Sequence, residues 1–170
     1  MGVAALERLR VGWNAGLKAW TFPMRDARGR IVGIQHRFCA DGQKRVVKGH
    51  RAGIFEPSTL DVKARELVIC EGASDTAAAL TLGLEAIGSF SAGTTRREIA
   101  ARVRHHRPRQ AVIVPDNDDA GRRGADALWR ALDGIVPASI RTPPAHIKDL
   151  RAWKRAGVTA GEITEGAGRR

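Results

Sequence analysis

Short apolar runs alternate with longer amphipathic stretches from residue 63 onward. The runs at 67–70, 85–90, 111–114 and 138–141 are predicted strands, and the stretches at 75–82, 95–105, 119–132 and 149–156 are predicted helices. Thr95 and Glu98 have the spacing of a capping box at the start of the second helix. Because strands that alternate with helices pair in parallel, the pattern predicts an α/β fold whose mostly parallel sheet is covered by helices on both faces.

The first third of the chain has a different pattern. Predicted strands at 18–24, 30–38 and 43–48 are separated by the turn-forming stretches Arg-Asp-Ala-Arg-Gly and Ala-Asp-Gly. This spacing predicts an antiparallel meander. We expect Trp20, Phe22 and Phe38 to lie in its small core rather than to serve as platforms for base stacking.

These two patterns divide the chain into three parts. Residues 1–62 are predicted to form a basic, strand-rich subdomain, and residues 63–156 the α/β domain. Residues 157–170 are rich in Gly, Thr and Glu, so we expect them to be a flexible tail.

The charge of the chain points toward a polyanionic partner. Its 170 residues include 29 Lys and Arg against 18 Asp and Glu, which gives a net charge of +11. A basic surface of this kind favours nucleic acid, because binding releases the counterions that surround the phosphates. A solvated, arginine-rich surface that reflects genomic base composition is the alternative interpretation.

Composition also excludes several classes of protein. Two cysteines, Cys39 and Cys70, cannot complete a four-cysteine zinc site, and no tyrosine is present to attack DNA covalently. The chain has no P-loop motif for an ATPase motor. No run of apolar residues is long enough to span a membrane, and the first residues do not resemble a secretory signal, so we expect a cytoplasmic protein without zinc or membrane contact.

Two acidic motifs directly follow predicted strands. Glu71 comes after the strand at 67–70, and Asp116 and Asp118 follow the strand at 111–114. Because residues just past the ends of parallel strands gather at one edge of the sheet, we expect these three carboxylates to converge. Magnesium and manganese prefer such oxygen ligands, so Glu71, Asp116 and Asp118 are candidate metal ligands and catalytic residues.

Two glycines fit this arrangement, and simpler interpretations remain open. Gly72 allows a tight turn into the next helix, and Gly121 allows the following helix to start close to the sheet. Taken alone, the run from Asp116 is also typical of a helix N-terminus, where acidic residues are favoured. Glu71 alone is equally typical of a surface residue at a strand end.

The motif Glu71-Gly-x-x-Asp75, followed by Asp116-x-Asp118-x-Ala-Gly121, resembles the Toprim domain. This Rossmann-like domain is shared by bacterial-type primases, type IA and type II topoisomerases and small nucleases. The resemblance covers residues 65–150 and implies that Glu71, Asp116 and Asp118 coordinate Mg²⁺ or Mn²⁺ for phosphoryl transfer. It also implies a third acidic motif, for which Asp149 is the candidate, although Asp149 is a good helix N-cap as well.

Four stretches precede this domain, at Ala19–Asp26, Gly29–Gln35, Lys44–Gly49 and Gly53–Pro57. Together they resemble the segment before Toprim in phage and plasmid primases, where it flanks the cleft for template and primer. The resemblance implies that Lys44, Arg45 and Lys48 contact phosphate or nucleotide. Arg122 and Arg123, just after the aspartate motif, are further candidates for contacts with triphosphate. Exposed arginines on a solvated face are the alternative for each.

Together these resemblances predict the catalytic core of a DNA primase. Such an enzyme joins ribonucleoside triphosphates into short RNA primers on a single-stranded DNA template. No zinc-binding module or helicase is recognisable in the chain, so a replicative helicase or a separate template-recognition module is an expected partner. A Toprim nuclease and a non-catalytic nucleic-acid-binding replication module are the alternatives, and the absence of tyrosine disfavours a topoisomerase.

Overall fold

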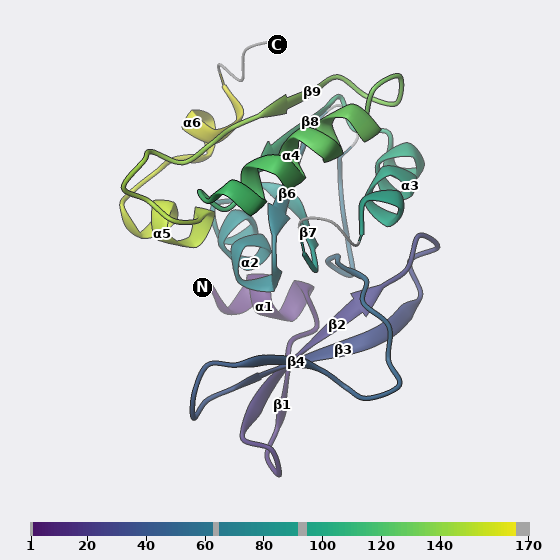
Figure 1. Cartoon of the computed structure of the whole chain (residues 1–170), viewed down its shortest axis with the longest axis vertical. Helices are drawn as coiled ribbons and strands as arrows, with labels where there is room; N and C mark the ends of the chain where they lie inside the picture. The colour runs from purple at the N-terminus through teal and green to yellow at the C-terminus, as the bar shows by residue number, and fades with distance from the viewer. Residues whose placement is uncertain (1, 63–64, 92–94, 166–170) are drawn as a thin grey trace.

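A computed structural model describes residues 2–62, 65–91 and 95–165. The described residues form a nine-stranded sheet in the order β4-β3-β2-β5-β7-β6-β8-β9, with β1 paired to β2 (Figure 1). The strands are β1 (Gly12–Asn14), β2 (Ala19–Arg25), β3 (Ile31–Phe38), β4 (Lys44–Val46), β5 (Ile54–Phe55), β6 (Glu66–Glu71), β7 (Glu85–Ser89), β8 (Gln110–Val114) and β9 (Ala138–Ile140). The helices are α1 (Val3–Arg8), α2 (Ala73–Thr81), α3 (Arg96–His106), α4 (Asp119–Ala131), α5 (Leu150–Arg155) and α6 (Ala160–Thr164).

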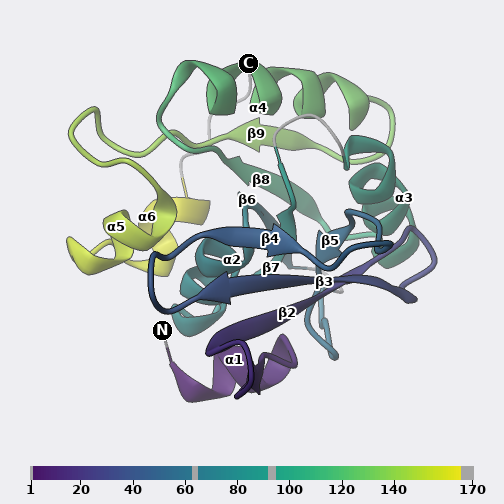
Figure 2. The same cartoon turned by 60° about the horizontal axis from the view of Figure 1, so that its bottom comes forward.

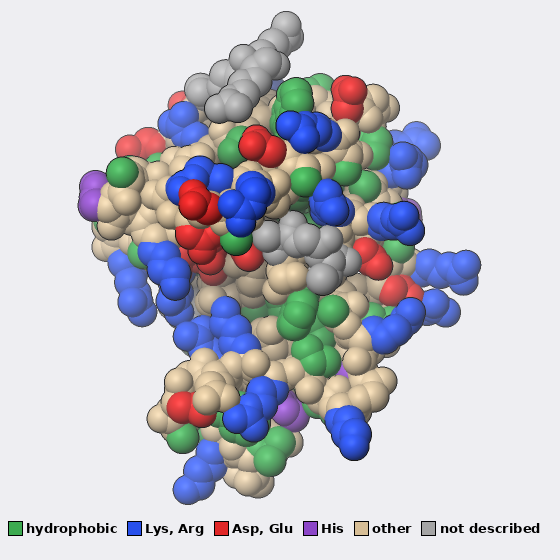
Figure 3. Space-filling model, viewed as in Figure 1, with side chains coloured by type: hydrophobic (Ala, Val, Ile, Leu, Met, Phe, Trp, Pro, Cys, Tyr) green, Lys and Arg blue, Asp and Glu red, His purple; other side chains and the backbone are tan. Residues whose placement is uncertain are grey.

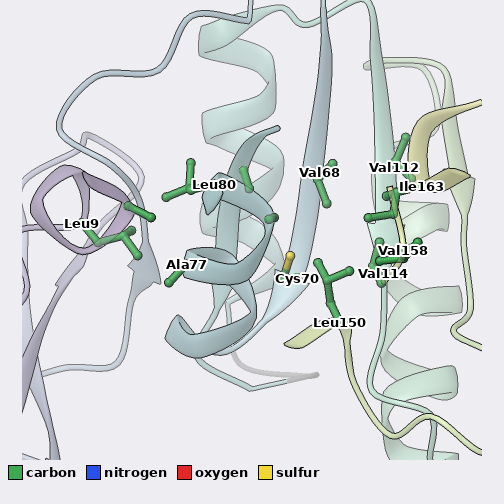
Figure 4. Packing of buried hydrophobic residues seen from close by; sticks show 13 residues of the cluster. Leu9, Val68, Cys70, Ala77, Leu80, Val112, Val114, Leu150, Val158 and Ile163 are labelled. Atoms are coloured by element: carbon green, nitrogen blue, oxygen red, sulfur yellow. The ribbon is translucent and has the colours of Figure 1, made fainter. Parts of the chain in front are cut away.

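The second half of the chain forms the parallel part of the sheet, and helices cover both of its faces. Strands β7, β6, β8 and β9 are parallel neighbours. Val68 and Cys70 of β6 pack toward α1, α2, α5 and α6, whereas Leu67 and Ile69 pack toward α3 and α4 (Figure 4 shows the first of these clusters). Successive strand residues thus bury opposite faces, which is the reason for the continuous apolar runs in the sequence. The predicted α/β fold is confirmed.

The first third forms the antiparallel part of the same sheet. Strands β2, β3 and β4 pair in sequence order, as the meander prediction requires. The two-residue strand β5 pairs with β2 through Arg25 and Ile54 and with β7 through Ile54 and Ser89, so it connects the two halves. Figure 2 shows the antiparallel strands lying in front of the parallel layer. The sheet is therefore continuous from the first third into the second half of the chain. The division into two domains near residue 62 stays a prediction.

Three sequence predictions differ from the structure. Residues 158–165 are not a flexible tail, because α6 has a complete capping box and buries Ile163, with Val158 just before it; residues 166–170 lie outside the described part. The capping box at Thr95 does not form, since the Thr95 hydroxyl donates to Ser89 Oγ at 3.2 Å instead. Trp20 is 44% exposed and so is not a core residue, whereas Phe22 is buried as expected.

Within the described ranges, no helix has both the length and the apolar character that crossing a bilayer requires.

Candidate functional site

Four of the predicted carboxylates lie at one edge of the sheet. Glu71 ends β6, Asp116 lies just after β8, Asp118 is the N-cap of α4 and Asp149 is the N-cap of α5. Figure 3 shows acidic side chains gathered on this face of the molecule. Burial, together with the negative charges of Glu71, Asp149 and Asp118, raises the pKa of Asp116 to about 6, and Lys148 opposes the shift. The carboxylates are thus close enough to repel one another.

Two of these carboxylates also cap helices. Asp118 Oδ1 accepts from Gly121 N at 2.7 Å, and Asp149 Oδ1 accepts from Ala152 N at 2.6 Å. The capping interpretation is therefore correct for both residues. Each hydrogen bond uses one carboxylate oxygen and fixes the direction of its side chain.

The donor set suits a hard divalent cation in kind, although not in its present spacing. Carboxylate oxygens at a crowded, negatively charged edge are the ligands that Mg²⁺ and Mn²⁺ prefer, and a cation would relieve the repulsion that raises the pKa of Asp116. Among the described residues, however, no three His, Cys, Asp or Glu side chains are grouped closely enough to chelate one ion. The residues therefore fit a cation that is also held by water or substrate oxygens.

Asp75 is a fifth acidic residue beside this group. It is buried at the start of α2, and its Oδ1 accepts from the backbone N–H of Arg151 at 2.8 Å. Burial and the charges of Asp149 and Asp116 raise the pKa of Asp75 to about 6. Asp75 thus ties α2 to α5, a link that the sequence motif alone did not reveal.

The two glycines of the motifs meet steric demands that other residues would not. Gly72 has a φ of +83°, a backbone conformation that residues other than glycine rarely adopt. A Cβ on Gly121 would lie 2.2 Å from the carbonyl oxygen of Asp116, so only glycine lets α4 start this close to β8. Both positions help to set the backbone that carries the carboxylates.

Asn117 organises the loop opposite these carboxylates. Its side-chain amide donates to the carbonyl oxygens of Pro143, Pro144 and Ile147 at 3.3, 3.0 and 3.1 Å, and its backbone N–H donates to Lys148 O at 2.7 Å. These bonds hold Lys148 and Asp149 beside Asp116. Asn117 and Lys148 were not singled out from the sequence, although both lie within the acidic motifs.

The predicted basic contacts separate into two groups. A Cβ on Gly72 would lie 3.8 Å from Lys44 Nζ, so the ammonium of Lys44 lies next to the turn that follows Glu71. Arg45 points to the opposite face of β4, where its guanidinium lies 5.4 Å from the ring centre of Phe38 and bonds to the side chain of Gln43. The structure therefore brings Lys44 to the carboxylate edge but not Arg45.

The remaining predicted basic residues are exposed. Lys48 lies beyond β4, and Arg123 lies on the second turn of α4. Arg122 bonds to Asn117 Oδ1 at 2.9 Å and to Asp119 Oδ1 at 2.7 Å, so its guanidinium is held beside the aspartate motif.

Known proteins share both the sequence and the fold. A Toprim-like family model matches residues 68–152, which is half of the chain. The DNA primase of Haemophilus influenzae is 31% identical over 127 residues, and that of Escherichia coli K12 is 29% identical over 127 residues. Each alignment covers 68% of this chain and 21% of the relative, so the chain spans about a fifth of the length of these curated relatives.

Solved structures show the same fold. The primase fragment of the bacteriophage T7 primase-helicase protein has a TM-score of 0.70 at 20% identity, covering 95% of this chain and 67% of that one. A DNA primase domain from Pseudomonas aeruginosa has a TM-score of 0.61 at 20% identity, covering 95% of this chain and 58% of that one. The chain therefore belongs to the Toprim-like family and has the fold of primase catalytic cores.

Proposed function

We propose that this chain is the catalytic core of a DNA primase, which joins ribonucleotides into short RNA primers on single-stranded DNA. The observation that carries the proposal is the cluster of Glu71, Asp116, Asp118 and Asp149 at the ends of parallel strands, with Lys44 of the antiparallel part beside it. Its curated relatives are DNA primases, and similarity to them supports the reaction class.

In this proposal Mg²⁺ or Mn²⁺ would bind among Glu71, Asp116, Asp118 and Asp149, with water or substrate oxygens completing its coordination. A cation bound there supplies Lewis-acid activation of the attacking 3′-hydroxyl and neutralises charge on the departing pyrophosphate. Asp118 and Asp149 keep fixed directions because each caps a helix. Asn117 positions the loop that carries Lys148 and Asp149.

Basic residues around the cluster are the proposed phosphate contacts. Lys44 is the strongest candidate, because its ammonium already lies beside the turn after Glu71. Lys48 and Arg123 are exposed and could reach a triphosphate or a template phosphate. Arg122 is exposed too, but its guanidinium would first have to leave Asn117 and Asp119. Arg45 faces the other side of the sheet and would contact only a nucleic-acid strand that wraps around β4.

The proposed substrates and partners are taken from solved primase structures of similar fold. A solved primase catalytic domain of similar fold is bound to single-stranded DNA, and primase domains from bacteriophage T7 are bound to an RNA/DNA hybrid. For this chain we propose a single-stranded DNA template and ribonucleoside triphosphates as substrates. A replicative helicase or a separate template-recognition module is the proposed protein partner.

Incorporation of labelled ribonucleotides on single-stranded DNA tests the proposal. With Mg²⁺ or Mn²⁺ present, we expect short RNA products from the wild type and a loss of about a thousandfold or more in Glu71→Gln, as for other groups that act directly on the reacting atoms. Glu66→Gln is the matched control, because it removes the same charge from the opposite end of β6 and should retain activity.

Scoring template cleavage in the same reactions separates the rival functions. Metal-dependent cleavage without synthesis, lost in Glu71→Gln, would reassign the chain to the Toprim nucleases. Binding of DNA without either reaction, even after addition of a helicase and a zinc-binding module, would favour the non-catalytic accessory role. Equal activity in Glu71→Gln and the wild type would contradict the carboxylate site itself.

A further inference from the structure

Two tryptophans form an exposed pair at the outer end of the antiparallel part. The rings of Trp13 on β1 and Trp20 on β2 meet edge to face, with their centres 5.1 Å apart and their planes at 62°. The two side chains remain 49% and 44% exposed. A cross-strand aromatic pair stabilises the hairpin, which accounts for the contact between the rings but not for the large ring surface left in water.

The pair belongs to one row of side chains across four strands. Trp13 pairs with Trp20, Trp20 pairs with Arg37 on β3, and Arg37 pairs with Lys44 on β4. Residues that pair directly point to the same face of a sheet, and neighbouring strands lie about 4.8 Å apart, so the row is about 14 Å long. Two aromatic side chains are thus followed by two cations on a single surface.

The cationic end of this row lies beside the carboxylate site. Lys44 Nζ is the atom that lies 3.8 Å from a Cβ placed on Gly72, the residue after Glu71. The neighbouring row, Phe22, Gln35 and Val46, faces the same way, and Phe22 packs against Ala73 of α2. The surface with the tryptophans therefore faces the α/β part rather than the far side of the sheet.

We propose that Trp13 and Trp20 form a base-stacking platform on which single-stranded DNA lies as it approaches the carboxylate site. The proposal rests on the primase function proposed above and assigns these two side chains to the template. Stacking on aromatic rings combined with cations along the backbone is the usual way in which proteins hold single strands without reading their sequence. Arg37 and Lys44 provide the charge complementarity, and the net charge of +11 favours the same ligand.

Binding of labelled oligo(dT), measured by fluorescence anisotropy at fixed salt and without metal or ribonucleotides, tests the platform. We expect the double variant Trp13→Leu/Trp20→Leu to bind about tenfold or more weakly, because it loses ring stacking but keeps an apolar surface. Trp13→Phe/Trp20→Phe should retain most of the affinity. Leu17→Ala is the matched control, since Leu17 is 47% exposed on the same hairpin and has no ring.

The salt dependence separates stacking from charge. The double variant Trp13→Leu/Trp20→Leu, called the Leu/Leu variant below, should leave the slope of the logarithm of the binding constant against the logarithm of the salt concentration unchanged. Arg37→Ala should reduce that slope by about one. Oligo(dT) should also quench the tryptophan fluorescence of the wild type, which checks the platform without any substitution. Thermal unfolding of each variant establishes that it is folded.

Each outcome decides the proposal. Equal oligo(dT) affinity of the wild type and a folded Leu/Leu variant, or absence of quenching in the wild type, would overturn the platform and would favour a protein partner for this patch. Absence of primer synthesis by the wild type would sink the primase function without changing this binding result. The two failures are therefore distinguishable.

Discussion

The two ends of the parallel strands carry the same type of residue in opposite electrostatic settings. At the beginning of β6, Glu66 pairs with Arg109, whose hydrogen bond lowers the pKa of Glu66. At the beginning of β7, Glu85 Oε2 lies 2.7 Å from Arg8 Nη2. At the other end, Asp116 is partly buried among acidic neighbours, and its pKa is raised to about 6.

This difference separates residues that stabilise the fold from residues that are poised for a ligand. A carboxylate that pairs with arginine stabilises the folded state. A cluster of carboxylates destabilises it until a cation binds among them. Shifted pKa values of this kind concentrate at functional sites. The raised pKa of Asp116 therefore marks this end of the sheet as the candidate site independently of any motif.

Breaking the buried ion pair between Glu56 and Arg102 should have the largest effect on stability. Glu56 follows β5, and its carboxylate bonds to Arg102 Nε and Nη2 at 2.9 and 2.6 Å and to His106 Nε2 at 2.7 Å. Arg102→Ala leaves this buried carboxylate with His106 alone, so we expect a loss of about 3 kcal/mol. Urea unfolding at pH 7 measures it. A loss below about 1 kcal/mol would mean that the pair is solvated rather than buried.

Removing one charge from the carboxylate edge should stabilise the folded chain rather than destabilise it. The pKa of Asp116 in the folded chain lies above its ordinary value of 3.8, so folding favours the protonated form. The corresponding stability is present below about pH 4 and is lost as the pH rises through about 6. In EDTA at pH 8 we therefore expect Asp116→Asn to be more stable than the wild type by about 1 to 2 kcal/mol, allowing for partial solvent screening.

The same substitution at low pH provides the control. At pH 4 the wild-type carboxyl is already protonated in the folded state, so the gain from Asp116→Asn should largely disappear. Paired urea unfolding curves at the two pH values measure the change. A wild type as stable as the variant at pH 8 would contradict the repulsion among these carboxylates.

The exposed pair at the start of β6 should have the smallest effect. The side chain of Arg109 is 65% exposed, and surface ion pairs contribute little because water screens them. We expect Arg109→Ala to lower the free energy of unfolding by less than about 1 kcal/mol. The difference should shrink further in 1 M salt, where the Debye length is about 3 Å. A larger, salt-independent loss would show that this pair stabilises the fold by another route.

Much of the fold could be predicted because its regular elements have strong local signals. The apolar strands β6, β7 and β8 and the helix α4 lie within one or two residues of their predicted positions. The short elements α1, β1, β5 and α6 were missed, because two to six residues have too little periodicity to stand out. Their positions depend on partners far along the chain, as in the pairing of Ile54 with Ser89.

The candidate site shows the same division. The spacing of Glu71, Asp116 and Asp118 after strand runs sufficed to place them at one edge of a parallel sheet. The sequence did not reveal that Asp75 ties α2 to α5, or that Lys44 and Arg45 face opposite sides of β4. Which face of a strand is inward depends on what packs against it.

The sequence by itself determined the alternation of strands and helices, the basic charge and the carboxylate motifs, because these are properties of neighbouring residues. Only the tertiary structure decided that β5 joins the two halves into one sheet and that Trp20 is exposed in a row with Trp13, Arg37 and Lys44. Strand register and long-range packing set those relations. They arise from contacts between segments that the chain brings together only on folding.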